Sequence, residues 1–153
     1  MARERLAHVL AVWFGCGHVP IAPGTAGTLG ALPLYFAVRP WGAGAVLLAA
    51  AVVAAVGIWA ASVVARKTGL EDPQIVVIDE VAGVLVTLAA APEGWLGTIA
   101  GVVLFRVFDF SKPWPAWAAE RGLPGGLGIV LDDVFAGIWA ALVLLGTRAF
   151  SPC

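Results

Sequence analysis

One stretch of the sequence, residues 43–65, constrains the fold more than any other, because its 23 consecutive residues carry no charged side chain. As an α-helix rising about 1.5 Å per residue, a stretch of this length crosses the roughly 30 Å hydrocarbon core of a bilayer. The whole composition agrees, since 61% of the 153 residues are hydrophobic and only 12% are charged, whereas soluble domains carry about 25% charged residues. The sequence therefore predicts an integral membrane protein.

Further apolar stretches follow the same pattern at residues 28–38, 76–91, 95–110 and 128–146. Residues 113–123 are amphipathic, and Trp114 and Trp117 within them are typical of a segment that lies at the membrane surface. We expect an all-α, polytopic membrane bundle that forms a single domain over residues 1–153. It would have four to five short spans, a Gly/Pro-rich N-terminal loop and a surface amphipathic segment. The lower number applies if residues 28–38 enter the membrane without crossing it.

The basic residues predict the orientation of these spans. With the N-terminus in the cytoplasm and five crossings, seven of the nine Lys and Arg residues lie at the inner side, and only Arg39 and Arg148 lie outside. This distribution satisfies the positive-inside tendency. It also places the loop at residues 15–30 and the charged residues near positions 79, 109 and 132 on one cytoplasmic face. The net charge of −1 predicts neither nucleic-acid binding nor a polybasic lipid anchor.

Carboxylates at the edges of the apolar stretches are the first candidates for chemistry. They are Asp79, Glu80, Asp109, Glu120, Asp132 and Asp133. Ionisable groups beside hydrocarbon are costly and normally mark function. Each adjacent pair could instead cap a helix N-terminus, but one acid suffices for a cap, and neighbouring carboxylates repel unless a cation lies between them. Because hard cations such as Mg²⁺ prefer oxygen ligands, the pattern favours a metal site.

A second group of charges, Arg106, Asp109 and Lys112, is spaced i, i+3, i+6 and shares one helix face. One interpretation is an ordinary intrahelical ion pair near the end of a helix. The other is that Asp109 binds a metal while the two cations hold anionic oxygens, as fixed cations readily do for phosphate. The sequence of this segment leaves both interpretations open.

The loop at residues 15–30 contains five glycines, two prolines and two threonines. Glycines let backbone N–H groups approach an anion, and the N-terminus of a following helix adds a favourable dipole. Gly24, Thr25, Gly27 and Thr28 are therefore candidate substrate-binding residues. The alternative is a packing or re-entrant turn, for which glycine-rich stretches are common in membranes. His18 is more typical of a polar loop residue than of a catalytic base.

Three segments of the chain together resemble the phosphatidylglycerophosphatase A family. They are GHVPIAPGTAGTLGALP at 17–33, IVVIDEVAGVLVTL at 75–88, and FRVFDFSKPWPAW with GGLGIVLDDVFAGIWA within 105–140. The resemblance implies a Mg²⁺-dependent phosphatase of the bacterial cytoplasmic membrane, with its site facing the cytoplasm, that removes the terminal phosphate of phosphatidylglycerol phosphate.

The resemblance also assigns expected roles to individual residues. The catalytic and metal-binding residues would be Asp79, Glu80, Asp109, Asp132 and Asp133. Arg106 and Lys112 would bind substrate, with the glycine loop beside them. Direct attack by water and an aspartyl-phosphate intermediate both remain open. The competing hypothesis is a small cation transporter or channel subunit whose acidic cluster binds the transported ion; it ranks lower because the acids lie at span ends.

Overall fold

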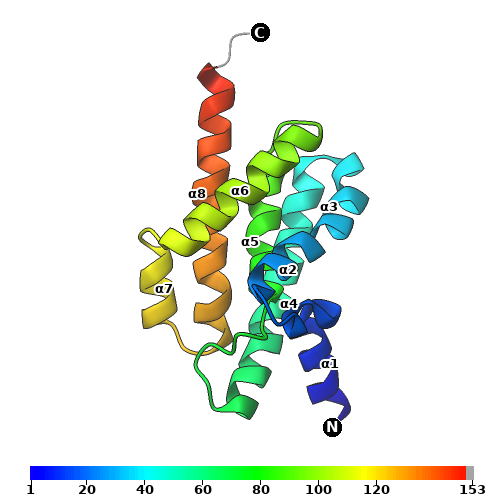
Figure 1. Ribbon diagram of the computed structural model, residues 1–153, viewed down its shortest axis with the longest axis vertical. Helices are drawn as coiled ribbons and strands as arrows, with labels where there is room; N and C mark the ends of the chain where they lie inside the picture. Colours follow the sequence, from blue (N-terminus) through cyan, green and yellow to red (C-terminus); the bar gives the residue numbers. More distant parts are fainter. Residues whose placement is uncertain (151–153) are drawn as a thin grey trace.

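The computed structural model describes residues 1–150, except for the side chain of Phe150. This part of the chain is helical with short connections (Figure 1). The elements in order are α1 (Ala2–Ala11), η1 (Trp13–His18), α2 (Pro23–Gly30), α3 (Leu32–Val38), η2 (Arg39–Trp41), α4 (Ala43–Thr68), α5 (Ile78–Ala89), α6 (Trp95–Ser111), α7 (Ala116–Gly122) and α8 (Gly126–Phe150). The expected all-α class is confirmed over these residues.

Two of the described helices are long and apolar enough to cross a membrane, namely α4 with 26 residues and the Gly126–Ala149 part of α8. Helix α4 ends where Gly69 adopts a left-handed conformation (φ +72°), which is the usual glycine stop for a helix. Helices α5 and α6 have only 12 and 17 residues. The structure therefore supports two full-length spans and does not confirm the expected four to five.

The stretch at residues 28–38, expected as one apolar segment, is broken into two helices. Helix α2 ends at Gly30, Ala31 follows, and α3 begins at Leu32 with a proline in its first turn. Proline lacks an N–H group and suits the start of a helix rather than its interior. The expected loop at 15–30 is likewise partly helical, because it contains most of η1 and all of α2.

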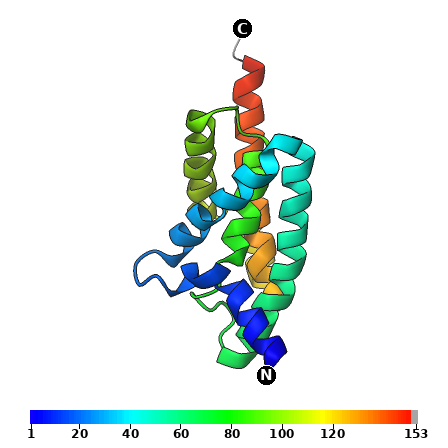
Figure 2. The ribbon, with the colours of Figure 1, turned by 90° about the vertical axis from the view of Figure 1, so that its right-hand side faces the viewer.

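Helix α5 occupies the centre of the bundle. It packs against α8, α4, α6 and α2, and Figures 1 and 2 show it enclosed by these helices. Its hydrophobic side chains are buried around most of the helix, including Val81, Val84 and Leu85, which have no exposed surface. A short helix that is apolar on all sides requires such a surrounded position.

The outer helices turn apolar side chains outwards. Large hydrophobic residues are exposed on α4, α6 and α8, among them Leu48, Val52, Val103, Val107, Leu142 and Leu145. Only 33% of the most apolar 18-residue stretch of α4 is buried inside the protein, whereas the core helix of a soluble protein would be mostly buried. Soluble monomers rarely expose so much apolar surface, so this surface agrees with a bilayer environment.

Candidate functional site

The first turn of α5 carries two acids into the protein interior. Asp79 is 8% exposed, and the side chain of Glu80 is 14% exposed. Within the described residues no side chain caps the N-terminus of α5, whose N-cap position is Val77, so neither acid is a side-chain cap. Both acids do lie in the first turn of α5, where a carboxylate suits the helix dipole. Asp79 Oδ1 and Glu80 Oε2 are buried and have no hydrogen-bond partner among the described residues.

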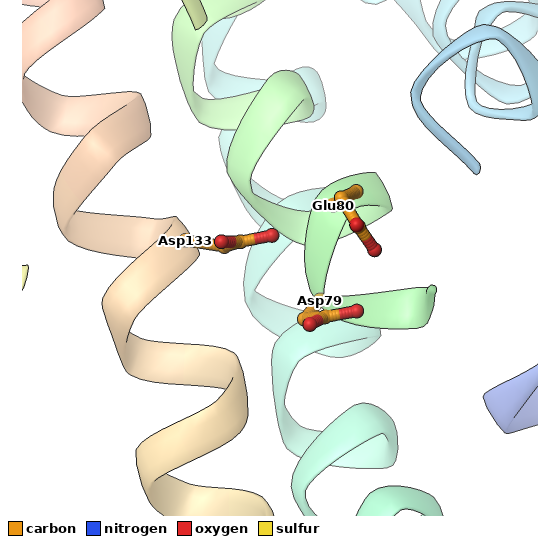
Figure 3. A group of neighbouring side chains, drawn as sticks. All are labelled: Asp79, Glu80 and Asp133. Carbon is orange, nitrogen blue, oxygen red and sulfur yellow. The ribbon is translucent and has the colours of Figure 1, made fainter. Parts of the chain in front are cut away.

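Asp133 approaches the same place from α8. Its carboxylate contributes an oxygen that lies within 4.8 Å of oxygens from Asp79 and Glu80. Figure 3 shows Asp133 extending from α8 towards the first turn of α5, which carries Asp79 and Glu80. Asp133 is 4% exposed, and its Oδ2 also lacks a partner in the described part of the chain. Asp132 and Asp133 were expected to open the last span, but α8 begins six residues earlier, at Gly126. Asp132 therefore does not cap this helix.

Two glycines allow α5 and α8 to approach closely enough for these acids to meet. A Cβ atom placed on Gly137 would lie 2.2 Å from the carbonyl oxygen of Gly83, and one on Gly83 would lie 2.5 Å from the carbonyl oxygen of Asp133. The Thr87 hydroxyl lies 3.3 Å from the Gly83 carbonyl and 3.2 Å from the Gly137 carbonyl, so it links the two helices. Backbone contact of this kind is available only where side chains are absent.

Helix α6 adds Arg106 and Asp109 to the site. The two side chains form an ion pair, and the same guanidinium nitrogen lies 3.9 Å from Glu80 Oε1. Arg106 also lies over the ring of Phe110, with 4.6 Å between its Cζ and the ring centroid. The intrahelical pair that the spacing allowed is thus present, but it is not a solvated surface pair, because it reaches the acids of α5.

Lys112 takes a different position from the expected one. It ends α6 in a left-handed conformation (φ +42°), which directs its ammonium group towards α7 and α8. There it binds Glu120 at 2.7 Å and Asp132 at 2.8 Å, rather than flanking Asp109. Burial alone would lower the pKa of Lys112, but its hydrogen bonds to Asp132 and Glu120 outweigh burial and raise that pKa above its usual value. The ammonium group therefore stays charged.

The glycine loop contributes one residue in direct contact with the acids. A Cβ atom on Gly24 would lie 2.2 Å from Glu80 Oε1 and 3.3 Å from a guanidinium nitrogen of Arg106. Thr25 is the next residue of α2 and is half-buried. Gly27 instead packs against Val77. Thr28 is fully buried, and its hydroxyl donates to the carbonyl of Gly24 at 2.9 Å, so Gly27 and Thr28 hold α2 in place rather than line an open site.

The group of Asp79, Glu80 and Asp133 has the chemistry of a metal site. Each acid has a buried oxygen without a partner in the described chain, and leaving ionised oxygens in this state is costly unless a cation neutralises them. Carboxylate oxygens are the ligands that Mg²⁺ prefers, and it usually takes only one or two of them together with water and substrate oxygens. Arg106 lies 3.9 Å from Glu80 and Lys112 binds Asp132, the residue before Asp133, so both cations are near enough to the group to hold an anionic substrate.

Sequence reasoning missed part of this arrangement. Glu120 was counted among the edge acids but given no role, although it shares Lys112 with Asp132. Asp72 was passed over, and Arg66 and Arg121 were counted only for the orientation of the spans, yet together with Asp132 these residues line a cavity of about 910 Å³. Their spacing in the sequence gives no signal, because they come from the end of α4, the loop after it, and α7.

Comparison with known proteins agrees with the motifs. The family model described as phosphatidylglycerophosphatase A matches residues 9–148. The chain is 37% identical over 140 residues to phosphatidylglycerophosphatase A of Escherichia coli (strain K12), covering 90% of this chain and 80% of the relative. It is 36% identical over 143 residues to the protein of that name from Haemophilus influenzae, covering 92% and 88%.

A third relative carries a different name. A Bacteroides thetaiotaomicron protein, named provisionally as a phosphatidylinositol-3-phosphatase, is 41% identical over 145 residues, which cover 88% of this chain and 89% of the relative. No solved structure matches the chain significantly.

Proposed function

Because this chain belongs to the phosphatidylglycerophosphatase A family, we propose that it hydrolyses the terminal phosphomonoester of phosphatidylglycerol phosphate, giving phosphatidylglycerol and inorganic phosphate. The observation that carries the proposal is the meeting of Asp79, Glu80 and Asp133, each with a buried oxygen that has no partner in the described chain. Arg106 lies beside Glu80, and Lys112 binds Asp132, the residue before Asp133. Phosphate monoesters hydrolyse extremely slowly in water, so their enzymes must supply strong electrostatic stabilisation and accurate positioning.

Mg²⁺ is the proposed cofactor, and the donor set fits it. Asp79 and Asp133 come from two different helices and would hold the ion between them, with Glu80 beside it. A bound Mg²⁺ supplies charge stabilisation to phosphoryl oxygens and lowers the pKa of a water molecule. The buried, unpartnered oxygens support this proposal because they offer ligands that nothing else in the described chain uses.

The residues around the acids have separable proposed roles. Arg106, held by its ion pair with Asp109, and Lys112 would orient the anionic phosphoryl oxygens. Two carboxylates are candidates for accepting a proton from the attacking water. Asp132 already accepts bonds on both oxygens, from the backbone N–H of Asp133 and from Lys112, whereas Glu80 Oε2 has no partner among the residues that the structure describes. Glu80 is therefore the proposed base.

The proposed location is the bacterial cytoplasmic membrane, with the site facing the cytoplasm. Lys67 at the end of α4 lies 3.4 Å from Glu4 of α1, so the N-terminal arginines and the cations that end α4 share one side of the bundle. Arg39 precedes α4 at its opposite end. This charge separation supports the orientation through the positive-inside tendency. The transporter hypothesis is not favoured, because the relatives of this chain carry the names of phosphatases.

Phosphate release from purified full-length protein in detergent tests the proposal. Wild type should release phosphate from phosphatidylglycerol phosphate with added Mg²⁺ and stop with EDTA. It should act more slowly on 3-phosphorylated phosphatidylinositol, and the reverse preference would contradict the substrate assignment. Asp79→Asn and Asp133→Asn keep the side-chain shape but remove a charged ligand, and each should lower turnover about 10³-fold. Glu93→Gln, in an exposed turn, is the matched control and should stay within twofold.

Metal binding has a separate readout that needs no turnover. A ligand that binds only the folded protein raises its unfolding temperature, so Mg²⁺ should stabilise the wild type and the Glu93→Gln control but not Asp133→Asn. Near-normal turnover in both aspartate variants, or equal stabilisation of all these proteins by Mg²⁺, would show that the metal assignment is wrong.

A further inference from the structure

A cavity of about 910 Å³ opens beside the acidic site, between the end of α4, the loop that follows it, the α7–α8 connection and the first turns of α8. Asp132 lines this cavity and also binds Lys112. The neighbouring residue, Asp133, belongs to the three-acid group. The cavity therefore meets the proposed active site at Asp132, and its volume is within the range of about 300–1,000 Å³ that is typical of small-molecule sites.

Two arginines line the cavity without a direct carboxylate partner in the described chain. Arg66 and Arg121 both line it, and neither forms an ion pair with a carboxylate in the part of the chain that the structure describes. Arg121 only lies over the ring of Trp117, with 5.9 Å between its Cζ and the ring centroid. By contrast, Lys112 and Lys67 are both paired with acids. A free guanidinium in a cavity is a ready partner for a phosphate group, which it can bind through two parallel hydrogen bonds.

The remaining polar lining defines the ligand further. Glu71, Asp72 and Glu120 line the same cavity as the arginines. So many carboxylates disfavour a bare phosphate ion, because like charges repel. Carboxylates are, however, good acceptors for hydroxyl groups. The mixed lining therefore suits a molecule that carries both a phosphate and free hydroxyl groups, which is the chemistry of a phosphorylated polyol.

We propose that this cavity binds the phosphoglycerol part of the lipid headgroup, with Arg66 and Arg121 holding its internal phosphodiester and the neighbouring carboxylates its hydroxyl group. This inference rests on the proposed function and deepens it, because it names the residues that select the headgroup. The terminal phosphate would then extend past Asp132 towards Lys112 and the three acids. Arg66 and Arg121 are specificity residues in this arrangement, and they touch the part of the substrate that does not react.

Steady-state kinetics on phosphatidylglycerol phosphate with the full-length protein test the two arginines. Arg121→Gln and Arg66→Gln should each raise KM about tenfold to a hundredfold, the loss expected when a charge-assisted hydrogen bond to an anion is removed, while kcat changes less than threefold. Arg121 gives the cleaner result, because Arg66 also borders a smaller space between α1 and α4.

Lys67→Gln is the matched control, since Lys67 follows Arg66 directly, pairs with Glu4 and does not line the cavity. Its KM should stay within twofold of wild type. Unchanged KM in both arginine variants would overturn the proposal, as would an equal rise in all three variants, which would indicate a general attraction to an anionic membrane surface. A fall in kcat at constant KM would also overturn it, because it would place the arginines in the chemical step.

Binding of a soluble probe separates this proposal from the proposed function. Isothermal titration calorimetry should show glycerol 3-phosphate binding to detergent-solubilised wild type and Lys67→Gln, at least tenfold more tightly than inorganic phosphate, with binding weakened tenfold or more in Arg121→Gln. Equal affinity for inorganic phosphate, or no saturable binding of glycerol 3-phosphate, would overturn the cavity assignment. A wild type that binds glycerol 3-phosphate in this way but does not hydrolyse the lipid would refute the proposed function and leave the cavity assignment standing.

Discussion

The close contact between α5 and α8 makes a quantitative prediction for Gly137→Ala. The new Cβ would lie 2.2 Å from the carbonyl oxygen of Gly83 and 3.2 Å from its Cα. Both atoms belong to backbone, so no change of rotamer relieves the clash, and the helices must separate by about 1.2 Å to reach an ordinary contact of 3.4 Å. Asp133 lies one helical turn before Gly137, so the separation would draw its carboxylate away from Asp79.

The expected result is a large loss of activity with a smaller loss of stability. A displacement of about 1 Å among reacting groups can cost on the order of 100-fold in rate. Overpacking costs about 1–3 kcal/mol, part of which is offset by the roughly 1 kcal/mol gain in helix propensity when glycine becomes alanine. Phosphate release at saturating lipid and thermal unfolding in the same detergent measure the two effects.

Gly146→Ala is the matched control, because Gly146 lies in the same helix and a Cβ there meets no atom of the described chain within 4 Å. It should retain turnover within twofold and gain slightly in stability. If Gly137→Ala kept wild-type turnover as well, the close approach of the two helices would not be what holds the acids together, and the argument from helix contact would be refuted.

Three other substitutions separate the roles of neighbouring groups. Lys112→Gln should lower kcat/KM about 10² to 10³-fold. The substitution removes a cation that is proposed to hold the phosphate, and it leaves the carboxylates of Asp132 and Glu120 unpaired. In the same kinetic assay the control Lys67→Gln should remain near wild type. Gly24→Ala should slow turnover about tenfold, because the new Cβ pushes the Glu80 side chain aside. Calorimetric titration should show that this variant also binds Mg²⁺ more weakly than wild type. Unchanged turnover and Mg²⁺ affinity would mean that α2 does not support the acids. Thr87→Val removes the hydroxyl that links α5 to α8. It should lower the free energy of unfolding by about 1 kcal/mol, measured by thermal unfolding, with little change in kcat. A large loss of kcat would instead indicate that Thr87 takes a direct part in the site.

Much of the candidate site could be anticipated from the positions of its charges. The acids at 79–80 and 132–133 and the charged face of α6 were expected on one side of the membrane, and the structure brings these segments together at one level of the bundle. Their catalytic and metal-binding roles remain predictions. The partners of Lys112 were not foreseeable, because they depend on the left-handed turn at the end of α6 and on the position of α7.

The division of labour between Asp132 and Asp133 shows why the rest was hidden. In the sequence they form one acidic pair. On a helix, consecutive side chains point about 100° apart, so Asp133 faces α5 and Asp132 faces Lys112 and the cavity. Which acid faces which neighbour depends on the rotation of α8 within the bundle, and local spacing does not determine that rotation.

The sequence alone determined that this chain is helical and strongly apolar, and it placed carboxylates where burial is costly. These properties are local, because they depend on hydrophobicity, on charge and on the lengths of apolar stretches. The tertiary structure decided which acids meet, that Lys112 joins Glu120 to Asp132, and that Arg66 and Arg121 share a cavity. These are contacts between residues far apart in the chain, and they are set by how closely the helices approach, which here depends on the backbone contact between Gly83 and Gly137.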